Sequence, residues 1–145
     1  MKRIYMDHNA TTPVDPRVLE RMWPFYADVW GNASSVHWAG LGPKDAIEDA
    51  RDQVATMVGA PSRDLFFTSG GTESDNTALL GVGYALKEKG RHIITSAIEH
   101  KAILDTVSAM EQLHGFEVTL LPVDSLGRVR PEDVQEALRE DTILV

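Results

Sequence analysis

Residues 66–76 constrain the fold more than any other stretch, because an apolar run gives way there to hydroxyls, two adjacent glycines and a helical pattern. Residues 65–67 are predicted to form a short buried strand, and a helix is predicted to open at Thr72 with Asp75 as its capping-box partner. Glycine lets a ligand approach the backbone, and the first N–H groups of a helix stabilise an anion such as phosphate. The residues leave open a plainer interpretation, in which residues 69–72 only cap the helix.

The second half of the chain alternates between residue patterns typical of strands and patterns typical of helices. Strands are predicted at residues 92–95, 116–121 and 142–145, and helices at residues 72–89, 101–113 and 131–138. With residues 65–67 this makes four strands and three crossover helices. The pattern predicts an α/β fold, a mostly parallel sheet with helices on both faces. Ligands bind beyond the carboxyl ends of such strands, so residues 69–72 and 96–100 are expected at one edge of the sheet.

The first third of the chain has weaker patterns. Residues 1–15 are predicted to form an N-terminal arm and a loop, and residues 16–145 the domain that follows. A helix is predicted from Pro16, with Asp15 as N-cap, to a stop or kink near Trp23. Residues 31–42 are predicted to be a loop and residues 43–58 a second helix, which Gly59 ends.

Composition argues against several classes of partner and bears on location and on thiol chemistry. A formal net charge of −8 and an isoelectric point near 5.0 argue against nucleic acid and anionic membranes as partners. No apolar run approaches the roughly 20 residues of a membrane span, and the first residues lack a signal peptide's apolar region, so a cytoplasmic location is expected. The sequence has no cysteine, so a thiol nucleophile would have to come from another chain or segment.

The histidines are the remaining candidates for chemistry. His100 is predicted at a strand-to-helix junction on the ligand edge, where an imidazole could stack on a flat ring or move protons, or could simply cap the helix. His92 and His114 are predicted to be surface residues, and His8 and His37 to be structural or solvated residues of two irregular loops. No histidine and carboxylate spacing is typical of a metal site, so none is expected.

Four short motifs occur in order along the chain and carry a resemblance. They are Asp7-His8-Asn9-Ala10-Thr11-Thr12-Pro13, Gly31-Asn32-Ala33-Ser34-Ser35-Val36-His37, Phe67-Thr68-Ser69-Gly70-Gly71-Thr72-Glu73-Ser74-Asp75-Asn76 and Glu99-His100-Lys101-Ala102-Ile103-Leu104. Together they resemble cysteine desulfurases of the class V aminotransferase family. The resemblance implies a fold-type-I enzyme that uses pyridoxal 5′-phosphate (PLP), converts L-cysteine to L-alanine and holds the sulfur as a persulfide. Iron–sulfur cluster assembly is the implied use of that sulfur.

The resemblance also assigns roles, position by position. Gly71 and Thr72 would bind the cofactor phosphate, and His100 would stack on the pyridine ring as the catalytic candidate. Asn9, Ala10, Thr11 and His37 would border the substrate pocket, partly across a dimer interface. The implied partners are a sulfur-acceptor protein and either a second copy or a complementary C-terminal chain.

The sequence departs from the family in two ways. Ala33 stands where the family usually has proline, and family members are more than twice as long. The family's cofactor-bonding lysine, its acid for the pyridine nitrogen, its substrate-binding arginine and its persulfide cysteine have no match here. Residues 16–145 are therefore expected to be the N-terminal part of the PLP-binding large domain, inactive alone. The alternatives are a noncatalytic interaction module with an exposed last strand, or another class V enzyme such as a selenocysteine lyase.

Overall fold

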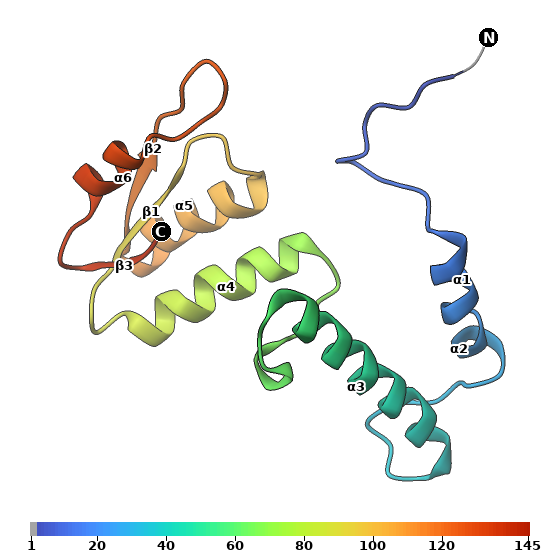
Figure 1. The fold of residues 1–145 in the computed structure, drawn as a ribbon. Helices are drawn as coiled ribbons and strands as arrows, with labels where there is room; N and C mark the ends of the chain where they lie inside the picture. The colour runs from blue at the N-terminus through green and yellow to red at the C-terminus, as the bar shows by residue number, and fades with distance from the viewer. Residues whose placement is uncertain (1–2) are drawn as a thin grey trace. The chain divides into compact units, whose positions relative to one another are not determined.

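The computed structural model describes residues 3–145 and divides the chain into two units, Met1–Phe66 and Phe67–Val145 (Figure 1). The first unit holds the helices α1 (Pro16–Met22), α2 (Pro24–Ala27) and α3 (Trp38–Val58) and the 3-10 turn η1 (Ser62–Asp64). The second unit holds α4 (Gly71–Leu86), α5 (Lys101–His114), α6 (Pro131–Ala137) and the strands β1 (His92–Ser96), β2 (Glu117–Leu121) and β3 (Thr142–Leu144). The predicted boundary after residue 15 stays a prediction.

The ends of the first-unit helices follow from local chemistry. The Asp15 carboxylate accepts a hydrogen bond from the backbone N–H of Arg17 at 2.8 Å and so caps α1, as predicted. Pro24 cannot continue α1 and instead opens α2 after Trp23. Gly59 ends α3 in the left-handed conformation, with φ of 70°.

The start of α3 corrects the sequence prediction. The helix begins at Trp38, not at Pro43, so the preceding loop is shorter than residues 31–42. Proline favours the first helical position, but Pro43 lies inside α3 and has no N–H to donate to the carbonyl of Ala39. The Gly31 backbone lies against that carbonyl so closely that a Cβ atom on Gly31 would overlap it. The loop therefore packs where the helix lacks a hydrogen bond.

The second unit is built on a parallel sheet in the order β2-β1-β3. The connection from β1 to β2 runs one way across the sheet and the connection from β2 to β3 runs back past β1. Because parallel crossovers are right-handed, α5 and α6 must then cover opposite faces. Helix α4 lies beside α5 (Figure 1). The predicted α/β class, a parallel sheet with helices on both faces, is confirmed.

The core of the second unit lies between the sheet and the α4–α5 layer. Its buried members come from α4, β1, α5 and the residue before β2: Leu79, Ile93, Val107, Met110 and Phe116. Gly83 of α4 is buried against Met110 and Phe116, and a Cβ atom there would overlap the Met110 side chain. This glycine lets α4 approach α5 closely.

The predicted strand at residues 65–67 is wrong, so the sheet has three strands in the part of the chain described here, not four. Phe66 is 80% exposed and Phe67 is 51% exposed, although burial was expected. A strand needs a neighbour that pairs its backbone N–H and C=O groups. Within residues 3–145 the sheet pairs β1 with β2 and β1 with β3, and this segment is not one of its strands. An apolar run alone therefore does not predict a strand.

Candidate functional site

The glycine turn at the start of α4 leaves the helix N-terminus open. Gly70 is the N-cap residue, and among residues 3–145 no side chain accepts a hydrogen bond from the first N–H groups of α4. The Glu73 carboxylate instead reaches back to Ser69, where it accepts from the backbone N–H and from the hydroxyl, each at 2.6 Å. These bonds hold the pKa of Glu73 below its ordinary value. The prediction that Asp75 caps this helix is therefore wrong, because Glu73 braces the turn.

The backbone of this turn is accessible to a ligand. A Cβ atom built at Gly70 or Gly71 would meet nothing within 4 Å, and the Thr72 side chain is exposed. The Oγ atoms of Thr68 and Ser74 lie 2.6 Å apart and secure the chain as it enters the helix. The open N–H groups carry the partial positive charge of the α4 dipole. The turn can therefore bind an anion through backbone amides and the Thr72 hydroxyl.

His100 is held by the first turn of α5. It is the N-cap residue, and its Nδ1 accepts a hydrogen bond from the backbone N–H of Ala102 at 3.1 Å. Since an amide N–H can only donate, Nδ1 is the acceptor and the neutral imidazole carries its proton on Nε2. The ring is otherwise exposed. Capping, which the sequence left open as an alternative, thus fixes the ring in place and leaves it accessible.

Helix packing brings the N-termini of α4 and α5 to the same end of the layer. Asn76 and Thr106, each the sixth residue of its helix, are hydrogen-bonded at 2.8 Å, and Gly83 faces Met110 farther along. The helices therefore run in the same direction, as Figure 1 shows. At 1.5 Å per residue, each first helical residue lies about 7.5 Å along its axis from that hydrogen bond. The two turns come together through helix packing, not through the predicted strand.

A hollow opens at the carboxyl ends of β1 and β3, beside these turns. Its polar lining is Asp75 of α4, with Thr95 and Glu99 on either side of the end of β1. The rest is apolar and comes from α4, the sheet and α5, including Leu79, Ile94, Ile103 and Leu144. The sequence analysis did not predict that Asp75 or Glu99 lines a hollow. The signal that could have indicated this is their position in the sequence, close to Thr72 and next to His100.

The predicted substrate-pocket residues lie in the first unit. Asn9, Ala10 and Thr11 follow Asp7 in a turn, in which the backbone N–H groups of Ala10 and Thr11 both donate to the Asp7 carbonyl. His37 is the N-cap residue of α3 and makes no side-chain capping bond. All four are exposed, and their role stays a prediction.

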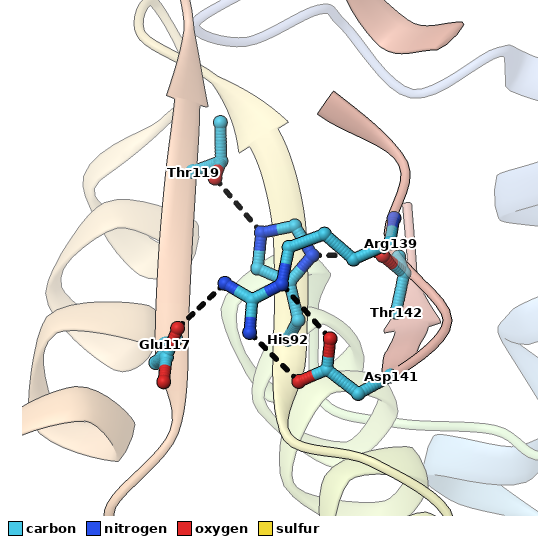
Figure 2. Close-up of polar contacts among 6 residues, drawn as sticks. All are labelled: His92, Glu117, Thr119, Arg139, Asp141 and Thr142. Carbon is cyan, nitrogen blue, oxygen red and sulfur yellow. Dashed lines mark hydrogen bonds and ion pairs between the residues drawn. The ribbon is translucent and has the colours of Figure 1, made fainter. Parts of the chain in front are cut away.

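His92 corrects another prediction, because it was expected at the surface and is 0% exposed (Figure 2). Its Nδ1 lies 2.7 Å from the Oγ1 atom of Thr142, and its Nε2 lies 2.8 Å from that of Thr119. Burial lowers the pKa of His92, as does the nearby Arg139 guanidinium, and the carboxylates of Asp141 and Glu117 oppose that shift. His92 is the first residue of β1. This cluster therefore lies at the amino ends of the strands, whereas α5 begins beyond the carboxyl end of β1.

None of the helices within residues 3–145 has both the length and the apolar character needed to cross a membrane. No three side chains of His, Asp or Glu in the same range are arranged to hold a metal ion.

Comparison with known proteins identifies the family. The aminotransferase class-V profile matches residues 4–145. The chain is 51% identical to the cysteine desulfurase IscS of Dictyoglomus turgidum, covering 100% of this chain and 37% of that protein. It is 50% identical to the putative cysteine desulfurase IscS 1 of Bacillus subtilis, covering 100% of this chain and 38% of that protein.

Solved structures agree with these relatives. A NifS-like protein matches with a TM-score of 0.90 at 43% identity, over 97% of this chain and 38% of that chain. SspA, solved in complex with cysteine, matches with a TM-score of 0.88 at 38% identity, over 95% of this chain and 40% of that chain. The chain therefore spans well under half the length of the relatives it matches. Since the family profile takes in nearly the whole sequence, the chain belongs to the class-V aminotransferase family.

Proposed function

We propose that this chain is the N-terminal, phosphate-binding part of a PLP-dependent cysteine desulfurase. The observation that carries the proposal is the uncapped N-terminus of α4, whose glycine backbone is open and whose neighbour α5 begins beside His100. The names of the relatives support the desulfurase reaction, and the cysteine bound to SspA supports the substrate class.

The residues of the turn fit the phosphate group of PLP. A phosphate dianion needs several donors and no steric obstruction, and the amides of Gly71 and Thr72 with the Thr72 hydroxyl meet both needs. His100, fixed by its bond to Ala102, would lie over the ring and keep its orientation. PLP, when bound, supplies the electron sink for the reaction at the substrate carbon. The residues of this chain bind the cofactor and orient it.

The remaining parts of the proposal concern the whole enzyme. L-cysteine would be converted to L-alanine, and the sulfur would pass through a persulfide to an acceptor protein for iron–sulfur cluster assembly. The lysine and the cysteine would come from a C-terminal segment or a complementary chain, and Asn9, Ala10, Thr11 and His37 would border the substrate. We propose a cytoplasmic location and assembly with a second copy. A selenocysteine lyase is the runner-up within the same family.

One observation favours an interaction role besides catalysis. Within residues 3–145, β3 lies at one edge of the sheet. An unpaired edge presents backbone groups that can pair with another strand. Light scattering of the 145-residue chain is expected to show association, and a stable monomer at all concentrations would count against this role.

Phosphate binding tests the central proposal directly. The chain is titrated with inorganic phosphate and with 4-deoxypyridoxine 5′-phosphate, which has no aldehyde and needs no lysine. Backbone NMR signals of Gly71 and Thr72 are expected to shift with both ligands, and ring signals of His100 with the second ligand alone. Thr72→Val should weaken binding of both. If the signals of α4 do not move although the chain is folded, the proposal fails.

Activity gives a second test. The chain has no cysteine to form a persulfide, so incubation with PLP and L-cysteine is expected to yield neither alanine nor sulfide. Production of alanine in amounts equal to the sulfide released would show that the isolated chain carries the whole reaction.

A further inference from the structure

Asn76 and Thr106 form the polar link between the two helices that begin at the site. The Thr106 hydroxyl donates to the Asn76 Oδ1 at 2.8 Å, and the Asn76 Nδ2 donates to the carbonyl oxygen of Thr72 at 2.8 Å. Within residues 3–145 this is the one side-chain hydrogen bond that joins α4 to α5. The Asn76 amide thus ties the first turn of α4 to the body of α5.

The hydrogen bond between Thr106 and Asn76 is largely shielded from solvent, so its loss should affect the structure. Thr106 is 9% exposed and Asn76 is half-buried, so water replaces a lost partner poorly. Beyond it, Gly83 packs against Met110, and Leu79 and Val107 share the core, while the rings of Tyr84 and His114 meet edge to face at the other end of the two helices. The apolar contacts are not directional, whereas a hydrogen bond sets both distance and angle. Asn76 and Thr106 therefore determine how the N-terminal halves of the two helices are aligned.

We infer that Asn76 and Thr106 are positioning residues, which hold the Gly71–Thr72 turn and the His100 ring at the separation that one cofactor molecule requires. The inference rests on the proposed function. A ligand that binds both helices depends on their alignment, and a ligand that binds one helix does not. Small displacements at a second anchor point reduce affinity strongly, because the ligand cannot satisfy both anchors at once.

The test compares a two-anchor ligand with a one-anchor ligand in the 145-residue chain. Thr106→Val keeps the shape of the side chain and removes the donor to Asn76. It should raise the dissociation constant of 4-deoxypyridoxine 5′-phosphate about tenfold and that of inorganic phosphate less than about twofold, since one hydrogen bond is worth roughly a factor of ten. Thr106→Ser restores the hydroxyl and should restore the affinity. Ser108→Ala is the matched control, because the Ser108 hydroxyl bonds Gln112 within α5.

A measurement without ligand separates the two proposals. In the free protein, Thr106→Val should shift the side-chain amide signals of Asn76 and speed their exchange with solvent, and Thr106→Ser should not. If the wild-type chain binds both ligands and Thr106→Val weakens both equally or neither, the positioning role is wrong and the proposed function stands. If the folded wild-type chain binds neither ligand, the proposed function fails, and unchanged Asn76 signals in Thr106→Val would independently overturn the link itself.

Discussion

The buried histidine at the amino end of the sheet should make the stability of the second unit depend on pH. His92 is held between Thr119 and Thr142, and Arg139 lies close by (Figure 2). Its pKa in the folded protein is lowered, so near and below pH 6.5 the unfolded chain binds a proton that the folded protein resists. Stability is therefore complete above the ordinary histidine pKa and falls as the pH drops through that value toward the lowered one.

The size of the effect has an upper bound. The ordinary pKa of histidine is 6.5. If His92 stayed neutral in the folded protein, acidification from about pH 7.5 to about pH 5.5 would lower the free energy of unfolding by up to about 1.4 kcal/mol. Asp141 and Glu117 reduce that figure because they favour the protonated ring. Carboxylates with lowered pKa values, such as Asp133, also contribute to the free energy of unfolding, but they lose that contribution at more acidic pH. The interval above pH 5.5 thus excludes the losses that come from these carboxylates.

Urea unfolding of the wild type and of His92→Gln at about pH 7.5 and pH 5.5 gives the assay. Glutamine can still donate and accept hydrogen bonds with the two threonines and does not titrate. The variant should be less stable at the higher pH and should lose less stability on acidification than the wild type. Parallel losses in the two proteins would refute the reasoning, as would a wild type that becomes more stable at pH 5.5.

Three further outcomes follow from residues of the second unit. Gly71→Ala should leave stability unchanged or raise it by up to about 1 kcal/mol, because its Cβ atom meets no neighbour, yet weaken phosphate binding measured by calorimetry. Glu73→Gln keeps an acceptor for Ser69 and removes a negative charge near the turn, so phosphate should bind more tightly at low salt, with the gain lost at high salt. Met110→Ala should cost about 2–5 kcal/mol in urea unfolding, since Met110 is 0% exposed, whereas Leu113→Ala at a 73% exposed position should cost little.

Local chemistry made much of the chain predictable. Asp15 with Pro16 predicted the start of α1, and Gly115 predicted the end of α5, where it adopts φ of 68°. Such signals lie within a few residues of the feature they determine, so they work without knowledge of the rest of the fold. The class of fold followed from the alternation of strands and helices for the same reason.

The predictions failed at three places where a local pattern did not decide the outcome. Residues 65–67 have the composition of a strand but lie outside the sheet that residues 3–145 form. Pro43 has the signal of a first helical residue, but α3 begins at Trp38 and Pro43 lies inside it. His92 has the polarity of a surface residue but meets two threonines from β2 and β3. The burial of His92 was decided by residues 27 and 50 positions away in the sequence.

The candidate site divides in the same way. The sequence alone predicted a helix start beside Gly71 and Thr72 and an imidazole at a second helix start, because both depend on neighbouring residues. It left open whether the first start is capped, and the structure shows Gly70 as its N-cap with no side-chain bond. The sequence also placed these two turns together, but through a strand that does not form. Only the tertiary structure decided how they meet at one end of the α4–α5 layer, because that follows from side-chain contacts such as Thr106 with Asn76. Local preferences shape each element, and contacts between elements bring their ends together.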